Sequence, residues 1–226
     1  MIDCVALLPI KRNSVRVPGK NFRKIAGKPL FSWILETLLI TDRVSRVVIN
    51  TDAAEQIRLA VDEIPDKVLI RDRRADLCGD TVSMNKIIAD DIGAVDATTY
   101  LMTHATNPLL TPRTIDEALV AFHKAKSAGA ADSLFSVTQM QTRFYDEKGK
   151  ALNHDPSNLV PTQDLPPWFE ENSNLYVFTR DSFFSTNARI GQKPLMFPMA
   201  RADAIDIDDE ESWKMAEALL IARERR

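Results

Sequence analysis

The sequence of 226 residues lacks several features that mark other classes of protein. It has two cysteines, Cys4 and Cys78, far apart and outside any CxxC motif, so we expect neither a disulfide framework nor a zinc site. This composition favours a reducing, cytoplasmic location. No apolar run approaches the roughly 20 residues of a membrane-spanning helix, and the N-terminal apolar stretch, interrupted by Asp3, is too short for a signal peptide. We therefore expect no membrane association.

The sequence also lacks a strong charge of either sign. With 29 Lys and Arg against 32 Asp and Glu, its net charge of −3 argues against general nucleic-acid binding. It contains no internal repeat and no low-complexity tract. A hydrophobic content of 45% and a charged content of 27% are typical of a globular enzyme. The length suits one α/β domain, which we expect to span residues 1–226.

A basic segment, residues 11–24, stands out against this balanced background. It holds six cations and no acidic residue, and it follows residues 4–10, which have the pattern of a buried strand. Ligands of open α/β sheets bind beyond the carboxyl ends of such strands. Cations and backbone N–H groups at that place hold phosphates. The segment therefore predicts a nucleotide-phosphate site, although a solvated basic loop remains the alternative.

Strand and helix patterns alternate through the first two thirds of the chain. We expect strands at 46–50, 67–71 and 99–103, and helices at 32–40, 53–64, 83–92 and 112–126. Thr81 or Ser83 would cap the third helix and Thr111 the fourth, with Pro112 at its first position. This alternation predicts a doubly wound, mostly parallel α/β sheet. Further strands are expected at 133–137 and 175–178, and a strongly amphipathic helix at 210–226.

Residues 139–172 interrupt this pattern with a polar stretch, which includes a turn at 146–150, and then a proline-rich stretch. The segment is too long for an ordinary connection. It carries apolar residues that it could not bury alone: Phe144, Tyr145, Leu152, Leu165, Trp168 and Phe169. We expect an arm that packs against a second copy of the chain in a homodimer; the alternative is a flexible surface loop.

An acidic segment near the C-terminus provides a second candidate site. If residues 205–208 are extended, Asp206 and Asp208 share one face and the two isoleucines share the other. Two carboxylates on one face suit Mg²⁺. The alternative is an acidic cluster at the start of the last helix, a role that the acidic residues at 209–211 fill better. Phosphate and metal sites together are the requirements of nucleotidyl transfer.

Six segments, in order along the chain, resemble the sugar-activating cytidylyltransferases, which include the CMP-sialic acid synthetases and, more distantly, the CMP-Kdo synthetases. These segments are 9–21 with 27–30, 50–52, 77–83, 106–109, 171–172 and 205–208. The resemblance implies a Rossmann-like nucleotidyltransferase fold with a dimerisation segment at 139–172. It also implies the reaction: CTP and a 2-keto-3-deoxy sugar acid would give a CMP-sugar and pyrophosphate, with Mg²⁺ as cofactor.

The same resemblance assigns roles to individual residues. Catalysis would fall to Lys20, Arg16 and Asp208, and Mg²⁺ would bind Asp206 and Asp208. The residues expected to bind the nucleotide are Lys11, Arg12, Asn13, Ser14, Asn21, Arg71, Asp80, Thr81 and Ser83. The residues expected to bind the sugar are His104, Thr106, Asn107, Gln163, Asn172 and Tyr176.

The departures from the family pattern gather at the sugar end. Relatives commonly carry glutamine where His104 stands and arginine where Thr162 stands, and CMP-sialic acid synthetases carry a lysine at Val15, for which Arg16 would substitute. His104 would either change charge near neutral pH or remain neutral and bonded to backbone. The sequence therefore leaves the sugar open. It also leaves two alternatives: a CMP-Kdo-type or other sugar nucleotidyltransferase using CTP, UTP or GTP, or a nucleotide-binding protein that has lost catalysis.

Overall fold

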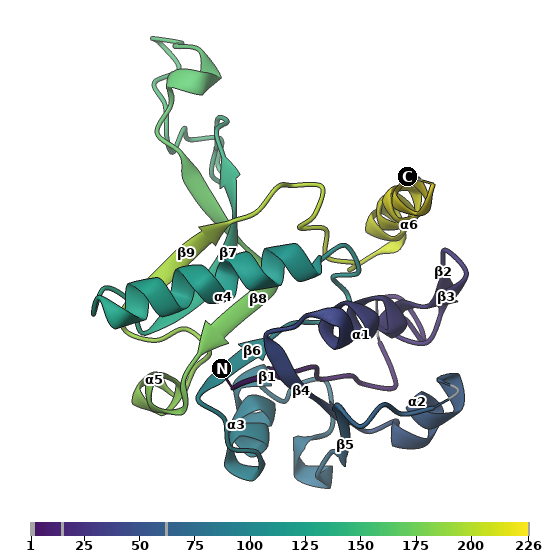
Figure 1. The fold of residues 1–226 in the computed structure, drawn as a ribbon. Coiled ribbons are helices and arrows are strands. Elements are labelled where there is room, and N and C mark those ends of the chain that lie inside the picture. The colour runs from purple at the N-terminus through teal and green to yellow at the C-terminus, as the bar shows by residue number, and fades with distance from the viewer. Residues whose placement is uncertain (1–2, 15, 62, 226) are drawn as a thin grey trace.

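The computed structural model describes residues 3–14, 16–61 and 63–225. Its centre is a seven-stranded sheet with the strand order β5-β4-β1-β6-β8-β7-β9, covered by helices on both faces (Figure 1). The strands are β1 (Cys4–Leu7), β4 (Val44–Thr51), β5 (Val68–Asp72), β6 (Thr99–Met102), β7 (Ser133–Met140), β8 (Trp168–Phe178) and β9 (Pro194–Pro198). All neighbours pair in parallel except β8, which is antiparallel to both β6 and β7. The predicted doubly wound, mostly parallel fold is confirmed.

Alternate residues of the strands feed two separate cores, as a pleated sheet requires. Ala6 of β1 faces a core formed with α1 (Leu30–Ile40), α2 (Ala54–Ala60) and α4 (Pro112–Ser127). Val5 and Leu7 face the opposite core, formed with α3 (Met84–Ala94) and α5 (Arg180–Thr186). Cys4 is buried in β1 as predicted, and both cysteines are free thiols. Within the described part of the chain, every helix is too short or too polar to cross a membrane.

A third, smaller core joins the C-terminal helix to the start of the chain. Helix α6 (Glu210–Glu224) packs Trp213 and Leu220 against Leu30 and a short hairpin of β2 (Lys24–Ile25) and β3 (Lys28–Pro29). The expectation of a strongly amphipathic helix is wrong, because its outer side also carries apolar residues: Met215 is 53% exposed. The helix nevertheless brings the acidic segment before it next to the basic loop.

Several predicted boundaries need correction. Helix α2 ends at Ala60 rather than at residue 64. Ser83 is the N-cap residue of α3, but its side chain makes no capping hydrogen bond with any described residue, whereas Thr111 accepts the predicted bond from the N–H of Thr114. The sequence analysis missed α5, β9 and the β2–β3 hairpin, and strand β8 begins seven residues before the predicted position 175. Two short 3₁₀ turns complete the fold, η1 (Ala75–Leu77) and η2 (Thr162–Asp164).

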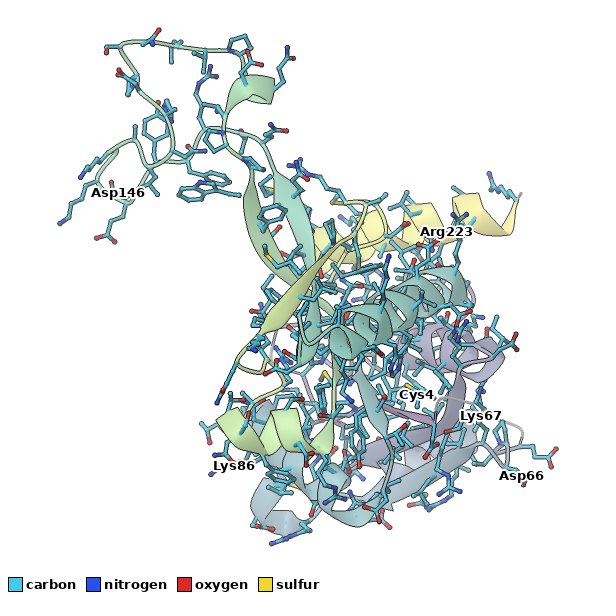
Figure 2. All side chains as sticks on the ribbon, turned by 60° about the vertical axis from the view of Figure 1, so that its left-hand side comes forward. Cys4, Asp66, Lys67, Lys86, Asp146 and Arg223 are labelled. Carbon is cyan, nitrogen blue, oxygen red and sulfur yellow. The ribbon has the colours of Figure 1, made fainter. Side chains whose placement is uncertain are left out.

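Strands β7 and β8 continue past the sheet as an antiparallel ribbon that projects from the body (Figure 1). Phe144 stacks on Trp168 with ring centroids 5.1 Å apart, and the predicted turn at 146–150 is closed by hydrogen bonds between Asp146 and Lys150. Asp146 lies out on this projecting part (Figure 2). Leu159 is 65% exposed. The arm thus presents apolar side chains that the single chain leaves uncovered, although Leu165, expected to be one of them, is only 5% exposed.

Candidate active site

A cavity of about 530 Å³ lies beyond the carboxyl ends of β1 and β6, where ligands of doubly wound folds bind. The basic loop after β1, the segment between β5 and α3, the residues after β6 and the acidic segment before α6 all contribute to its lining. A second cavity of about 480 Å³ lies at the base of the arm. Ser173, Asp206 and Asp208 line both cavities, so the acidic pair stands where the two meet.

The basic loop is held in shape by its own residues. The side-chain amide of Asn21 donates to the carbonyl of Lys11 at 2.8 Å, closing the loop. Gly19 has a φ of +64°, a conformation that glycine adopts without strain. Val17 is fully buried in the core shared with α6. These contacts direct loop side chains toward the cavity, which is lined by Lys11, Ser14, Arg16, Lys20 and Asn21.

The cations of the basic loop meet the carboxylates of the acidic segment. Lys20 is only 7% exposed; its ammonium donates to the carbonyl of Ile207 and lies 3.4 Å from Asp208 Oδ1. A guanidinium nitrogen of Arg16 lies 2.8 Å from the same oxygen. Burial lowers the pKa of Lys20, while Asp208 and Asp206 oppose that shift. Residues almost 190 positions apart in the chain therefore converge on one point, as the two motifs predicted.

The acidic pair is presented as the alternating pattern predicted. Ile207 is buried, and its N–H donates to the carbonyl of Thr106 at 2.9 Å, which ties the segment to the end of β6. Asp206 and Asp208 both point into the cavities. Burial raises the pKa of Asp206; a hydrogen bond from the Thr106 side chain opposes the increase, and the negative charge of Asp208 adds to it. The alternative role at the start of α6 belongs to Asp209, whose carboxylate accepts from the N–H of Ser212.

The arrangement of this pair fits a magnesium ion. Asp206 Oδ1 is buried without a hydrogen-bond partner among the described residues, which is a costly state for a carboxylate oxygen unless a cation approaches it. The described residues form no cluster of three or more metal-ligating side chains of the His, Cys, Asp and Glu types. Mg²⁺ accepts such a poor protein ligand set, because it commonly takes one or two carboxylates and completes its shell with water and substrate phosphates.

The structure brings four of the predicted nucleotide-binding residues to the cavity: Lys11, Ser14, Asn21 and Asp80. Lys11 Nζ lies 2.9 Å from Asp80 Oδ1, so these two side chains join the basic loop to the segment before α3. Val15, where CMP-sialic acid synthetases carry a lysine, lies outside the described residues.

The other five predicted residues do not line this cavity in the described structure: Arg12, Asn13, Arg71, Thr81 and Ser83. The first two line a separate hollow beside α2, Thr81 is exposed, and Ser83 lines a small hollow at the start of α3. Arg71 is drawn away by ion pairs with Asp90 and Asp91 of α3. Because Asp91 is almost fully buried, its need for a counter-charge explains the position of Arg71.

Arg73 is a cavity residue that the sequence analysis missed. Its Nε donates to Asn50 Oδ1 at 2.9 Å, and a terminal nitrogen donates to the carbonyls of Asn50 and Ile10. The guanidinium is thus fixed across the ends of β4 and β1. Its place two residues after the predicted strand 67–71 was the available signal, but Arg71, at the end of that strand, offered the same residue type.

Two of the predicted sugar-binding residues, His104 and Thr106, line the main cavity. Asn172 lines the second cavity and accepts a hydrogen bond from the hydroxyl of Ser136. Asn107 is fully buried and lines neither cavity described here. Gln163 lies on the arm, where its carbonyl accepts from the side-chain amide of Gln141, and one chain does not bring it to either cavity.

Tyr176, the last predicted sugar-binding residue, lies beneath a second missed residue. Arg189 stacks on the Tyr176 ring, 3.8 Å from its centroid, and lines the main cavity beside His104. Burial, reinforced by the charges of Arg189 and Lys20, lowers the pKa of His104 to about 3. The expectation that His104 would change charge near neutral pH is therefore wrong. The ring is neutral there, and its described partner is Arg189 rather than the backbone.

Comparison with known proteins agrees with this geometry. The sequence profile of the family described as "Cytidylyltransferase" matches residues 5–203. The chain is 26% identical to CMP-N,N'-diacetyllegionaminic acid synthase of Legionella pneumophila, covering 96% of this chain and 95% of that one. It is 24% identical to a pseudaminic acid cytidylyltransferase of Campylobacter jejuni, covering 95% of each. It is 29% identical to N-acylneuraminate cytidylyltransferase B of Danio rerio, where it covers 94% of this chain but half of the longer relative.

Solved structures share the fold at lower sequence identity. CMP:2-keto-3-deoxy-manno-octonic acid synthetase complexed with CTP matches with a TM-score of 0.69 at 18% identity, over 98% of this chain and 99% of that chain. A 4-diphosphocytidyl-2C-methyl-D-erythritol synthase from Anaerococcus prevotii matches with a TM-score of 0.70 at 11% identity, over 97% and 96%. The family indicated by the sequence motifs is thus confirmed: the chain belongs to the cytidylyltransferase family and is a CTP-dependent nucleotidyltransferase.

Proposed function

We propose that this protein transfers CMP from CTP to a 2-keto-3-deoxy sugar acid of the nonulosonate class and releases pyrophosphate. The observation that carries the proposal is the convergence of Lys20 and Arg16 on Asp208 within one cavity. Relatives over nearly the whole chain are named for legionaminic and pseudaminic acids, which are acidic sugars. A cavity with a cationic loop and a paired carboxylate suits a nucleoside triphosphate together with such an acceptor.

The reaction is an in-line substitution at the α-phosphorus of CTP. The anomeric hydroxyl oxygen of the acceptor forms the new P–O bond, the bond to the bridging α–β oxygen breaks, and pyrophosphate leaves with the electron pair. Lys11, Arg16 and Lys20 would hold the triphosphate and stabilise the charge that develops on it. Asp208, 40% exposed in its side chain, would receive the hydroxyl proton. The protein therefore works mainly by positioning and charge.

Mg²⁺ forms part of the proposal, with Asp206 and Asp208 as its protein ligands. When bound, it would neutralise phosphate charge and lower the pKa of the attacking hydroxyl. Lys20 contacts the Asp208 carboxylate and the carbonyl of Ile207, which lies between the two aspartates. The unpartnered oxygen of Asp206 supports this assignment.

We further propose that residues 139–172 form a dimerisation arm on a single catalytic domain of residues 1–226. The exposed apolar side chains of the arm support a homodimer: Tyr145, Leu152, Leu159, Val160, Trp168 and Phe169. The two free cysteines suit a reducing cytoplasm. Nucleic acid has no place in the proposal, because the net charge is −3.

A product screen tests the proposal. The purified protein is incubated with CTP, Mg²⁺ and, in separate reactions, sialic, legionaminic, pseudaminic, Kdo and KDN acids. Pyrophosphate release and the mass of the CMP-sugar are measured, and UTP and GTP replace CTP in parallel reactions. We expect turnover with CTP and at least one nine-carbon acid. Turnover only with Kdo, or only with UTP or GTP, would contradict the proposed substrates, and CTP binding without any product would indicate lapsed catalysis.

A further inference from the structure

Arg189 stands apart from the other cations of the main cavity. It follows α5, is stacked on Tyr176 of β8 and lies 3.3 Å from Nε2 of His104, which follows β6. The basic loop, by contrast, follows β1, and Arg73 follows β5. In the strand order β5-β4-β1-β6-β8 these groups occupy opposite sides of the cavity. Arg189 therefore lies on the side away from the triphosphate-binding loop.

Neighbouring side chains hold the Arg189 guanidinium in one place. Its planar face lies on the Tyr176 ring, and one terminal nitrogen is 3.4 Å from Glu171 Oε1. Glu171 is itself fixed by a hydrogen bond from the Tyr176 hydroxyl. The other terminal nitrogen donates to neutral His104. The side chain of Arg189 is only 20% exposed, so it is already held in place. It therefore loses little conformational entropy when it binds a ligand.

The charges around Arg189 leave it able to bind an anion. Arg16 and Lys20 share Asp208, and Lys11 has Asp80. Among the described residues, Arg189 contacts one carboxylate, that of Glu171, at the long distance of 3.4 Å. Glu171 also accepts from Tyr176. A guanidinium has five N–H groups, more than these partners engage, and its fork matches a carboxylate.

We infer that Arg189 binds the carboxylate of the acceptor sugar acid and thereby selects acidic acceptors. This inference rests on the proposed function. The carboxylate of the acceptor is bonded directly to the anomeric carbon that carries the reacting hydroxyl, so a fixed cation on the β6–β8 side orients that hydroxyl toward the α-phosphorus. Tyr176, Glu171 and His104 are positioning residues for Arg189. The neutral ring of His104 is compatible with a site for an acidic sugar, because its role is to accept a hydrogen bond from Arg189.

The test pairs a change in the protein with a change in the substrate. Arg189→Gln is compared with the wild type on the sugar acid that the wild type uses and on its C1 carboxamide. We expect kcat/KM for the acid to fall about 10- to 100-fold, as the loss of a hydrogen bond to a charged group implies. Turnover of the amide should change less than threefold, and so should KM for CTP. Arg189→Lys, which keeps the charge without the fork, should retain part of the preference for the acid.

Two further arginines supply controls. Arg180→Gln removes one positive charge from α5, where Arg180 pairs with Asp96 outside the cavity. This variant should keep the full preference for the acid. Arg201→Gln tests the rival position, because Arg201 lines the second cavity. An unchanged acid-to-amide ratio in Arg189→Gln, or its loss in Arg201→Gln instead, would overturn the inference. Absence of product from the wild type with every sugar acid would instead overturn the proposed function.

If Arg189→Gln fails to fold, as judged by circular dichroism and calorimetric CTP binding, Arg189→Lys decides the matter. Its acid-to-amide ratio should be reduced relative to the wild type. A wild-type ratio in that variant would show that the guanidinium fork does not contact the carboxylate, and would overturn the inference by itself.

Discussion

Replacing Lys20 with methionine should separate the catalytic role of the buried ammonium from its structural role. Methionine keeps the length and packing of the side chain while removing its charge. In the structure the ammonium group of Lys20 lies 3.4 Å from Asp208 Oδ1 and donates a hydrogen bond to the carbonyl of Ile207. Arg16, 2.8 Å from the same carboxylate, remains in the variant to neutralise Asp208.

The structural cost of this change should be small. At 3.4 Å, the attraction between Lys20 and Asp208 is about 5 kcal/mol for an effective dielectric of 20 and about 1 kcal/mol in water. Because the Asp208 side chain is 40% exposed and retains Arg16, the lower figure applies. Burying the ammonium of Lys20 is unfavourable, as its lowered pKa indicates. Removing this charge therefore offsets part of the lost attraction to Asp208. The carbonyl of Ile207 also loses its donor, which costs about 1 kcal/mol, so we expect the free energy of unfolding to fall by about 1–2 kcal/mol.

The catalytic cost should be much larger. Removal of one preorganised donor from a developing phosphate charge costs about 3–4 kcal/mol, or 10²–10³ in kcat. Pyrophosphate release measured over a range of CTP concentrations gives kcat, and urea unfolding gives the stability. Lys24→Met is the matched control, because Lys24 is an exposed cation of the same basic segment, on β2, and its loss should leave kcat within threefold. If Lys20→Met retains kcat and kcat/KM for CTP within threefold, Lys20 does not contact the transferred phosphate.

Three further outcomes are expected. Asp208→Asn should abolish the Mg²⁺-dependent rate and leave circular dichroism unchanged; a wild-type Mg²⁺ titration would remove Asp208 from the metal site. Because the pKa of His104 is lowered to about 3 in the folded protein, the unfolded chain takes up a proton near pH 6.5 that the folded chain does not, so this group lowers stability as pH falls. Between pH 6.5 and 5 this group lowers the free energy of unfolding by about 2 kcal/mol. Urea unfolding of His104→Gln should therefore show a flatter dependence of stability on pH than the wild type. Identical slopes for the two proteins would contradict the burial of a neutral His104. Deletion of residues 141–155 should shift the protein toward monomer in sedimentation, whereas an unchanged dimer would exclude that part of the arm from the interface.

Local signals in the sequence predicted the central elements of the fold well. Buried strands such as Cys4–Leu7 are short apolar runs, and Thr111 with Pro112 marks the start of α4 through bonds made within one turn. Strand β9 was missed because Pro194–Pro198 has proline at both ends and lies at the edge of the sheet, where few ladder bonds are required. Helix α5 was missed because its seven residues are too few to show a clear period.

Two arginines at the end of β5 show which part of the site the sequence could not predict. Arg71 and Arg73 are the same residue type, two positions apart near the end of β5. Arg71 turns to Asp90 and Asp91, and Arg73 turns to Asn50 and the cavity. The choice depends on where α3 places its carboxylates, which no local pattern reveals. Arg189 was missed for the same reason, since its partners come from β8 and from the residues that follow β6.

The sequence by itself determined the alternation of strands and helices, the cationic loop after the first strand and the one-sided presentation of Asp206 and Asp208. Each of these follows from residue type and from periods of a few residues. Only the tertiary structure decided that Lys20 and Asp208 meet, that Arg71 leaves the cavity while Arg73 enters it, and that Arg189 lies on Tyr176 beside a neutral His104. These outcomes depend on contacts between residues distant in the chain, whose balance of desolvation and ion pairing arises only when the sheet and its helices are packed together.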